Sequence, residues 1–189
     1  MRPFKAHSVE SAPQESKPML EASQKAFGML PNLHAVMAES PALLEAYKTI
    51  HETFSTKTAF NAEELTVVWQ SINVENECHY CVPAHTAIAH GMKIDAAITD
   101  ALRNNTALPN AKLEALRDTT LAIIRNQGNV SQEQLNKFYE AGYANKHYLD
   151  ILVGYSQKIM SNYTNHIAKT EVDAPFQPFA WSKEATPAQ

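Results

Sequence analysis

Apolar residues recur at intervals of three and four along most of the chain, which is the spacing of one face of an α-helix. Helix start and end signals bound these stretches: a Pro at the first turn, capping boxes at Asn61 and Ser131, and Gly at the ends. No strand-length alternation bounded by turns is present in the sequence. The pattern predicts helices at about 17–27, 41–54, 62–72, 78–90, 95–103, 110–128, 131–142 and 145–168.

These elements predict one all-α domain, a helical bundle with about seven to ten helices. In the long helix at 145–168, the apolar residues Leu149, Leu152, Tyr155, Ile159 and Tyr163 lie on one side. After residue 173 the sequence is rich in prolines and aromatic residues, so we expect no helix there but a tail that docks on the body or on a neighbouring subunit. The expected organisation is a flexible segment at 1–15, the all-α domain at 16–170 and a Pro/aromatic tail at 171–189.

Composition and charge narrow the function classes. The chain has 189 residues with 16 Lys+Arg against 20 Asp+Glu, a formal charge of −4, which excludes a polybasic nucleic-acid binder. Only 5 residues are Gly, and this shortage favours helices over hairpins. No apolar run reaches the length of a membrane span, and the polar text after Phe4 is not that of a signal peptide. We therefore expect a cytoplasmic protein without a nucleic-acid or membrane partner.

The densest group of reactive residues is Cys78, Cys81 and His85. In a helix their spacing of i, i+3 and i+7 places both thiols and the imidazole on one face, near the helix N-terminus. The positive end of the helix dipole and a nearby His⁺ favour the thiolate, which is the nucleophilic form of cysteine. Two thiols at this spacing can also close a disulfide, so the pair can cycle between dithiol and disulfide.

Other readings of the same residues remain open. Two Cys and one His can bind zinc with Glu64 or another His as the fourth ligand, or the cysteines can be incidental core residues. Covalent haem attachment is excluded because Val82 stands where a His would follow the second Cys. Glu64 borders the buried stripe of the preceding helix, and antiparallel packing would let it reach His85 or a thiol.

Glu64 followed by a Cys-x-x-Cys-x-x-x-His motif resembles the alkylhydroperoxidase D and carboxymuconolactone decarboxylase superfamily. The segments 28–32, 40–41 and 162–166, with Asp173 and Phe176, also look like its uncharacterised peroxidase-related branch. The resemblance implies an all-helical fold of alkylhydroperoxidase D-like type that assembles into a homo-oligomer, such as a dimer, trimer or hexamer. It also implies a thiol peroxidase without metal, haem or other cofactor.

Carried over by the motif, Cys81 is the peroxidatic nucleophile, Cys78 resolves it, and His85 and Glu64 relay the proton. Glu64 precedes Cys78 by fourteen residues, about two more than the family spacing, so Glu75 and Glu77 are alternative relay carboxylates. The predicted function is therefore the reduction of alkyl hydroperoxides in antioxidant defence, with an external thiol or dithiol as reductant. The alternatives are a carboxymuconolactone decarboxylase-like enzyme acting on a small carboxylate or lactone, and a non-enzymatic redox or zinc-binding oligomer.

Overall fold

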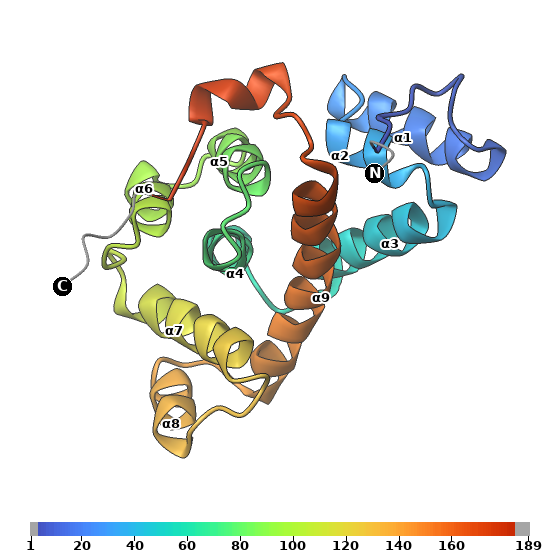
Figure 1. Cartoon of the computed structure of the whole chain (residues 1–189). Coiled ribbons are helices and arrows are strands. Elements are labelled where there is room, and N and C mark those ends of the chain that lie inside the picture. Colours follow the sequence, from blue (N-terminus) through green and yellow to red (C-terminus); the bar gives the residue numbers. More distant parts are fainter. Residues whose placement is uncertain (1–3, 184–189) are drawn as a thin grey trace.

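The computed structural model describes residues 4–183, which form helices joined by short turns and contain no strand (Figure 1). The predicted all-α, single-domain fold is confirmed. The elements are η1 (Gln14–Ser16), α1 (Lys17–Phe27), α2 (Asn32–Met37), α3 (Pro41–Lys57), α4 (Ala62–Glu75), α5 (Cys81–Gly91), α6 (Ala96–Asn104), α7 (Ala111–Arg125), α8 (Gln132–Glu140), α9 (Asn145–Ala168) and η2 (Ala174–Phe179).

The predicted helix signals act where the sequence places them. Helix α1 has Pro18 in its first turn and ends at Gly28, whose φ of 70° lies in the left-handed region that glycine adopts without strain. At the start of α4, the Asn61 N–H donates to Glu64 Oε2 and the Glu64 N–H donates to Asn61 Oδ1, both at 3.0 Å. This capping box satisfies two backbone donors that the first turn of a helix leaves free.

Three expectations about the elements are wrong. Helix α5 begins at Cys81 rather than at 78, because α4 runs on to Glu75 and Cys78 lies in the turn between the two helices. The short helix α2 was not predicted, since its six residues carry no capping side chain. The tail also contains a helix, η2, in which the Phe176 N–H donates to Asp173 O at 2.8 Å.

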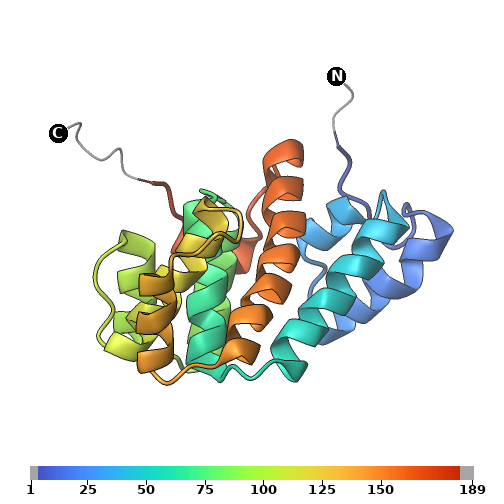
Figure 2. The same cartoon turned by 90° about the horizontal axis from the view of Figure 1, so that it is seen from below.

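Helix α4 lies at the centre of one group of helices, with α5, α6 and α7 around it, while α1, α2 and α3 form a second group (Figure 1). The long helix α9 lies between these groups and packs on α4 and α3, and the view from below shows the three helices side by side (Figure 2). One apolar cluster surrounds α4 and includes Phe54, Val68 and Phe138. The second cluster contains both cysteines and joins α1, α2, α3 and α5.

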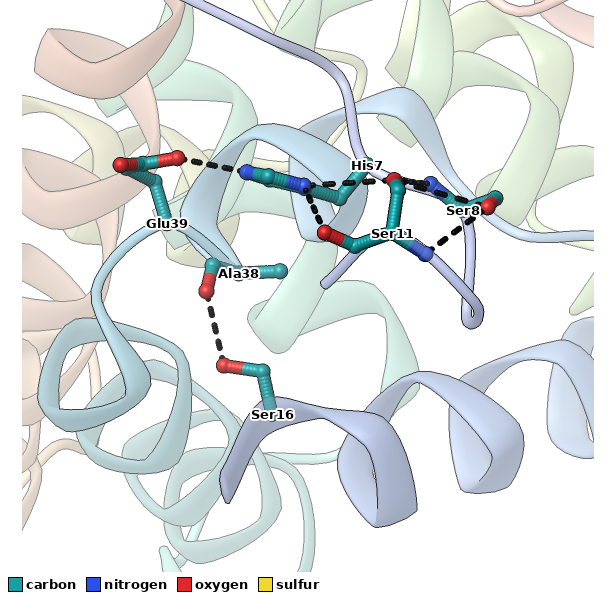
Figure 3. Close-up of polar contacts among 6 residues, drawn as sticks. All are labelled: His7, Ser8, Ser11, Ser16, Ala38 and Glu39. Carbon is teal, nitrogen blue, oxygen red and sulfur yellow. Dashed lines mark hydrogen bonds and ion pairs between the residues drawn. The ribbon is translucent and has the colours of Figure 1, made fainter. Parts of the chain in front are cut away.

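Both ends of the described chain contact the body. Near the N-terminus, the His7 ring bonds to the Ser11 carbonyl at 2.9 Å and to Glu39 at 2.5 Å, and the Ser16 hydroxyl donates to the Ala38 carbonyl (Figure 3). At the other end, the Arg103 guanidinium donates to the carbonyls of Phe179 and Ala180. The tail therefore docks on the body, as predicted.

Helix α9 turns a polar side inward. Gln157, Lys158, Ser161, Asn162 and Asn165 are all fully buried, whereas Leu149, Leu152, Tyr163 and Ile167 are exposed. This orientation is the reverse of the usual one for an amphipathic helix. The buried polar side faces the cysteines, so α9 supplies polar groups to the interior. None of the described helices meets the length and hydropathy needed to cross a membrane.

Candidate active site

The two cysteines lie on either side of the turn that starts α5. The Cys78 N–H donates to the Asn73 carbonyl at 2.9 Å, and the Cys81 N–H donates to Cys78 Sγ at 3.2 Å. Both thiols are buried, and no disulfide joins them. Cys78 Sγ therefore accepts an N–H of the first turn of α5, and Cys81 is the first residue of the helix.

Side-chain amides from α9 fix the position of the Cys81 sulfur. Asn165 Nδ2 donates to Cys81 Sγ at 3.2 Å. Asn162, one turn earlier, donates to Asn73 Oδ1 at 3.0 Å and accepts from Asn76 Nδ2 at 2.9 Å, which ties α9 to the end of α4. Fixed amide donors favour a charged acceptor, so this arrangement stabilises a thiolate at Cys81.

Lys158 is the buried cation of the site. Its side chain is fully buried, and its Nζ lies 2.7 Å from His85 Nε2. An ammonium can only donate, so His85 accepts at Nε2 and carries its own proton on Nδ1. Burial, together with the neighbouring Lys158 charge, keeps the pKa of His85 well below its ordinary value. His85 is therefore neutral, and the positive charge resides on Lys158.

The environment separates the two thiols in acidity. Burial alone would raise the pKa of Cys81, but the bond from the Cys78 thiol, the Lys158 charge and the amides of Asn162 and Asn165 outweigh it and lower this pKa. The pKa of Cys78 is raised, because its thiol donates to Cys81 and is itself buried. Burial lowers the pKa of Lys158, and the charges of the two sulfurs oppose this effect. The favoured state is a Cys81 thiolate paired with an ammonium at Lys158.

A cavity of about 260 Å³ opens over this pair. Cys81, His85 and Lys158 contribute to its wall, and Cys78 does not. The remaining lining is mostly apolar and aromatic and comes from α1, α2, α3, α5, the segment between α1 and α2, the cysteine turn and the tail: Phe27, Met29, Pro31, Leu33, His34, Tyr47, His51, Tyr80, Ala84, Ala87, Ile88, Pro175 and Phe176. An electrophile in the cavity therefore meets Cys81 first, with Cys78 behind it.

The C-terminal strap, defined here as residues 173–183, closes one side of this cavity. The Tyr80 hydroxyl donates to Asp173 Oδ2 at 2.5 Å, and the Asn32 N–H donates to Asp173 Oδ1 at 3.1 Å. Burial, followed by this bond to a carboxylate, raises the pKa of Tyr80, so the hydroxyl keeps its proton. Since Tyr80 lies between the two cysteines in the sequence, the strap and the cysteine turn share one hydrogen-bond network.

Glu64 does not join the thiols. Its carboxylate bonds to the Asn61 N–H and to Lys112 Nζ at 2.9 Å, at the N-terminal end of α4, whereas the cysteine turn follows the C-terminal end. Glu75 pairs with Arg125, and Glu77 pairs with Lys183. The expected contact of Glu64 with His85 or a thiol is therefore not formed in the described structure. The partner of His85 is Lys158 instead.

The structure brings Cys81, Cys78 and His85 together as the motif indicated, but not as one helix face. In the described part of the chain, no three His, Cys, Asp or Glu side chains gather closely enough to hold a metal ion. Sequence reasoning missed Lys158 and Asn165. The available signal was the spacing of the polar residues Gln157, Ser161 and Asn165, which is i, i+4 and i+8 on one side of a helix.

No protein-family model matches the sequence, and the search of curated proteins finds no match. Among solved structures, similarity extends over nearly the whole chain. An uncharacterized peroxidase-related protein with an alkylhydroperoxidase AhpD core, from Ralstonia eutropha JMP134, superposes with a TM-score of 0.81 at 18% identity, covering 93% of this chain and 96% of the other. A peroxidase-related protein from Silicibacter sp. TM1040 gives 0.77 at 18% identity, covering 93% and 96%.

The debrominase Bmp8, solved as a cysteine-to-alanine variant in complex with 2,3,4-tribromopyrrole, gives a TM-score of 0.78 at 16% identity, covering 94% of this chain and 95% of the other. Proteins with peroxidase-related and debrominase names thus share one backbone arrangement. At these identities the similarity establishes the fold and leaves the reaction open. The chain has the alkylhydroperoxidase D-like fold that the cysteine motif led us to expect.

Proposed function

We propose that this protein is a thiol-dependent reductase of organic hydroperoxides, in which Cys81 attacks and Cys78 resolves. The observation that carries the proposal is that Cys81 lies in the wall of a mostly apolar cavity, with Asn165 donating to its sulfur and the buried Lys158 charge lowering its pKa. A nucleophilic cysteine needs a low pKa and access to its substrate, and Cys81 has both. Cys78 has the raised pKa and the position behind Cys81 that suit a resolving thiol.

The proposed first step transfers one oxygen atom. The Cys81 thiolate attacks the terminal oxygen of ROOH, the O–O bond breaks, and the terminal OH stays on sulfur as a sulfenic acid. The leaving RO⁻ takes a proton from the Lys158–His85 pair, in which Lys158 donates to His85 Nε2 and His85 carries a proton on Nδ1. The products of this step are ROH, Cys81–SOH and a neutral Lys158.

In the second step, the Cys78 thiol attacks the Cys81 sulfur, a disulfide forms, and water leaves. An external dithiol then reduces the disulfide through a mixed disulfide, and a proton from the donor recharges Lys158. Over the cycle, two electrons pass from the dithiol to the O–O bond. Because Cys78 is buried and outside the cavity wall, the external donor first meets the Cys81 sulfur.

The test is a count of free thiols before and after one equivalent of cumene hydroperoxide. We expect the wild type to lose both thiols and recover them with a dithiol, and Cys78→Ser to react for a single stoichiometric round. Cys81→Ser should not react. Multiple turnover by Cys81→Ser, or two thiols that persist in the wild type, would show that the proposal is wrong.

A second candidate function is reductive dehalogenation of a small halogenated aromatic compound, which the aromatic lining of the cavity favours. The Cys81 thiolate would then attack the halogen atom, and the aryl carbanion would take its proton from the Lys158–His85 pair. The Cys78 thiol would attack the resulting Cys81 sulfenyl halide, form the disulfide, release halide and return its proton to Lys158, and an external dithiol would reduce the disulfide. Release of bromide from 2,3,4-tribromopyrrole with a dithiol, in the absence of peroxide turnover, would select this function over the first.

A further inference from the structure

Two histidines in the cavity wall have no part in the proposed chemistry. His34 comes from α2 and His51 from α3, and both line the cavity that Cys81 faces. They belong to a row of rings with Tyr47 and Trp69 that leads to His85, with centroid separations of 5.6, 6.1, 5.7 and 4.9 Å along the row. The hydrogen bonds behind the two rings determine what each of them presents to a ligand.

His34 presents an acceptor. The Ser23 hydroxyl donates to the Met19 carbonyl at 2.8 Å, so its oxygen can only accept from its other neighbours. Lys48 Nζ donates to this oxygen at 2.7 Å, and His34 Nδ1 lies 2.9 Å from it. His34 therefore carries its proton on Nδ1, and its Nε2 keeps a lone pair for which the described residues offer no hydrogen-bond partner.

His51 presents a donor. The indole N–H of Trp69 can only donate, and it bonds to Gln157 Oε1 at 2.7 Å. This bond fixes the orientation of the Gln157 amide, whose Nε2 donates to His51 Nδ1 at 2.9 Å. His51 therefore accepts at Nδ1 and carries its proton on Nε2, which is the opposite arrangement to His34.

Neither ring adds charge to the cavity at neutral pH. Burial, followed by nearby lysine and histidine charges, lowers the pKa of His34 to about 3, and burial with the charges of Lys158 and Lys48 lowers that of His51 to about 4. Among the described lining residues, Lys158 is the one lysine or arginine, and it is matched by the Cys81 thiolate. A carboxylate ligand would therefore find no unmatched cation in the wall.

We infer that His34 and His51 select a small, neutral aromatic ligand that carries an O–H or N–H donor, with His34 Nε2 accepting that hydrogen and the His51 N–H facing an electron-rich atom. A cavity of about 260 Å³ has room for one substituted aromatic ring, since an apolar cavity of about 150 Å³ binds benzene. A hydroperoxyl O–H is a donor of the same kind. The inference rests on the proposed function only in taking this cavity as the substrate site.

The test uses inert probes on the reduced wild-type protein, so it requires no turnover. Phenol and anisole have similar shapes, but only phenol donates, and indole and 1-methylindole repeat the comparison for an N–H donor. We expect each donor to bind about tenfold more tightly than its methylated partner, because the partner leaves the His34 lone pair unmatched. Dissociation constants are measured by calorimetry.

The matched variants are His34→Phe, which keeps a ring but removes the acceptor, and His166→Phe, which changes an exposed histidine of α9. His34→Phe should reduce the preference for the donor to within about twofold, and His166→Phe should keep it in full. Equal binding of phenol and anisole by the wild type, absence of binding by every probe, or a preference retained in His34→Phe would overturn the inference.

A second measurement does not depend on how a variant folds. Nitrogen NMR of the wild-type histidines should show His34 protonated on Nδ1 and His51 on Nε2, with the His34 Nε2 signal shifting when phenol binds. The reverse tautomers would overturn the inference. If the donor preference and the tautomers stand while peroxide leaves both thiols intact, the proposed function fails and the ligand class remains.

Discussion

Replacing Lys158 with Met tests the electrostatics of the site. Methionine has a similar length, but removing one partner of a buried ion pair leaves the other charge uncompensated, which costs stability unless that group takes up a proton. The Cys81 thiolate loses the cation that helps to hold its pKa below the ordinary value of about 8.5. We therefore expect the pKa of Cys81 to rise in Lys158→Met.

Two opposing effects give the magnitude. For each unit by which the pKa rises, the thiolate fraction at a pH below both pKa values falls about tenfold, while the remaining thiolate becomes about threefold more nucleophilic. The net loss of rate is about threefold per unit at low pH. Above both pKa values all the thiol is ionised, so there the variant should react about threefold faster per unit. The two pH–rate curves should cross.

The assay is the rate of Cys81 alkylation by iodoacetamide from pH 5 to 10, measured in a Cys78→Ser background so that a single thiol reports. Lys112→Met is the matched control, because Lys112 pairs with Glu64 at the other end of α4 and should leave the curve unchanged. Superposable curves for Cys78→Ser with and without Lys158→Met would refute the role of Lys158. A uniform loss of rate at every pH would show a packing defect instead of an electrostatic one.

Four further predictions follow from contacts described above or adjoining them. Glu64→Gln keeps the capping interaction and loses a half-exposed ion pair with Lys112, so stability should fall by about 1 kcal/mol or less in urea unfolding. The rate of peroxide-driven thiol loss should stay within twofold of wild type, and a tenfold loss of this rate would restore Glu64 as the relay. Gly154→Ala places a Cβ 2.7 Å from the fully buried Phe54 ring. This overpacking costs about 1–3 kcal/mol and should exceed the helix-propensity gain of about 1 kcal/mol, so the variant should be less stable than wild type. A higher melting temperature would contradict the packing. His34 has a pKa of about 3 in the folded chain and 6.5 in the unfolded chain, so the unfolded chain binds more protons between these pH values. The free energy of unfolding should therefore fall as the pH falls through this window, and it should fall less steeply in His34→Phe. Parallel curves of stability against pH for the two proteins would contradict this. We expect the exposed apolar side of α9 to be covered by a second copy of the chain, so Leu149→Glu with Ile167→Glu should lower the mass seen by light scattering, and an unchanged mass would contradict this.

The sequence was sufficient for most of the fold because the helix signals are local. Capping at Asn61 and the end at Gly28 depend on residues within one turn, so they are readable without tertiary information. Helices α2 and η2 were not predicted from the sequence because they are short and are held by contacts from distant segments, such as the bond between Asp173 and Asn32. Packing, not periodicity, decides such elements.

The residues of the candidate site also fall into those that the sequence reveals and those that only packing brings to the site. Cys78, Cys81 and His85 are close in sequence and could be found as a motif, whereas Lys158 is 73 residues from His85 and reaches it only through the packing of α9. The apolar side of α9 suggested the opposite orientation, since a buried lysine is rare without a partner. The tautomers of His34 and His51 depend on Ser23 and Gln157, which no motif connects to them.

The C-terminal strap forms part of the cavity wall with residues from outside the reactive helices. Pro175 and Phe176 line the cavity from outside the cysteine turn and helices α5 and α9, and Asp173 anchors the segment through Tyr80 and Asn32. Changes at Pro175 and Phe176 therefore alter the shape of the cavity, and a change at Phe176 also reaches the cysteine turn, because its ring meets the Tyr80 ring edge-on with centroids 6.4 Å apart. In evolutionary terms, selection or engineering can reshape this cavity at two tail residues that lie outside α5 and α9.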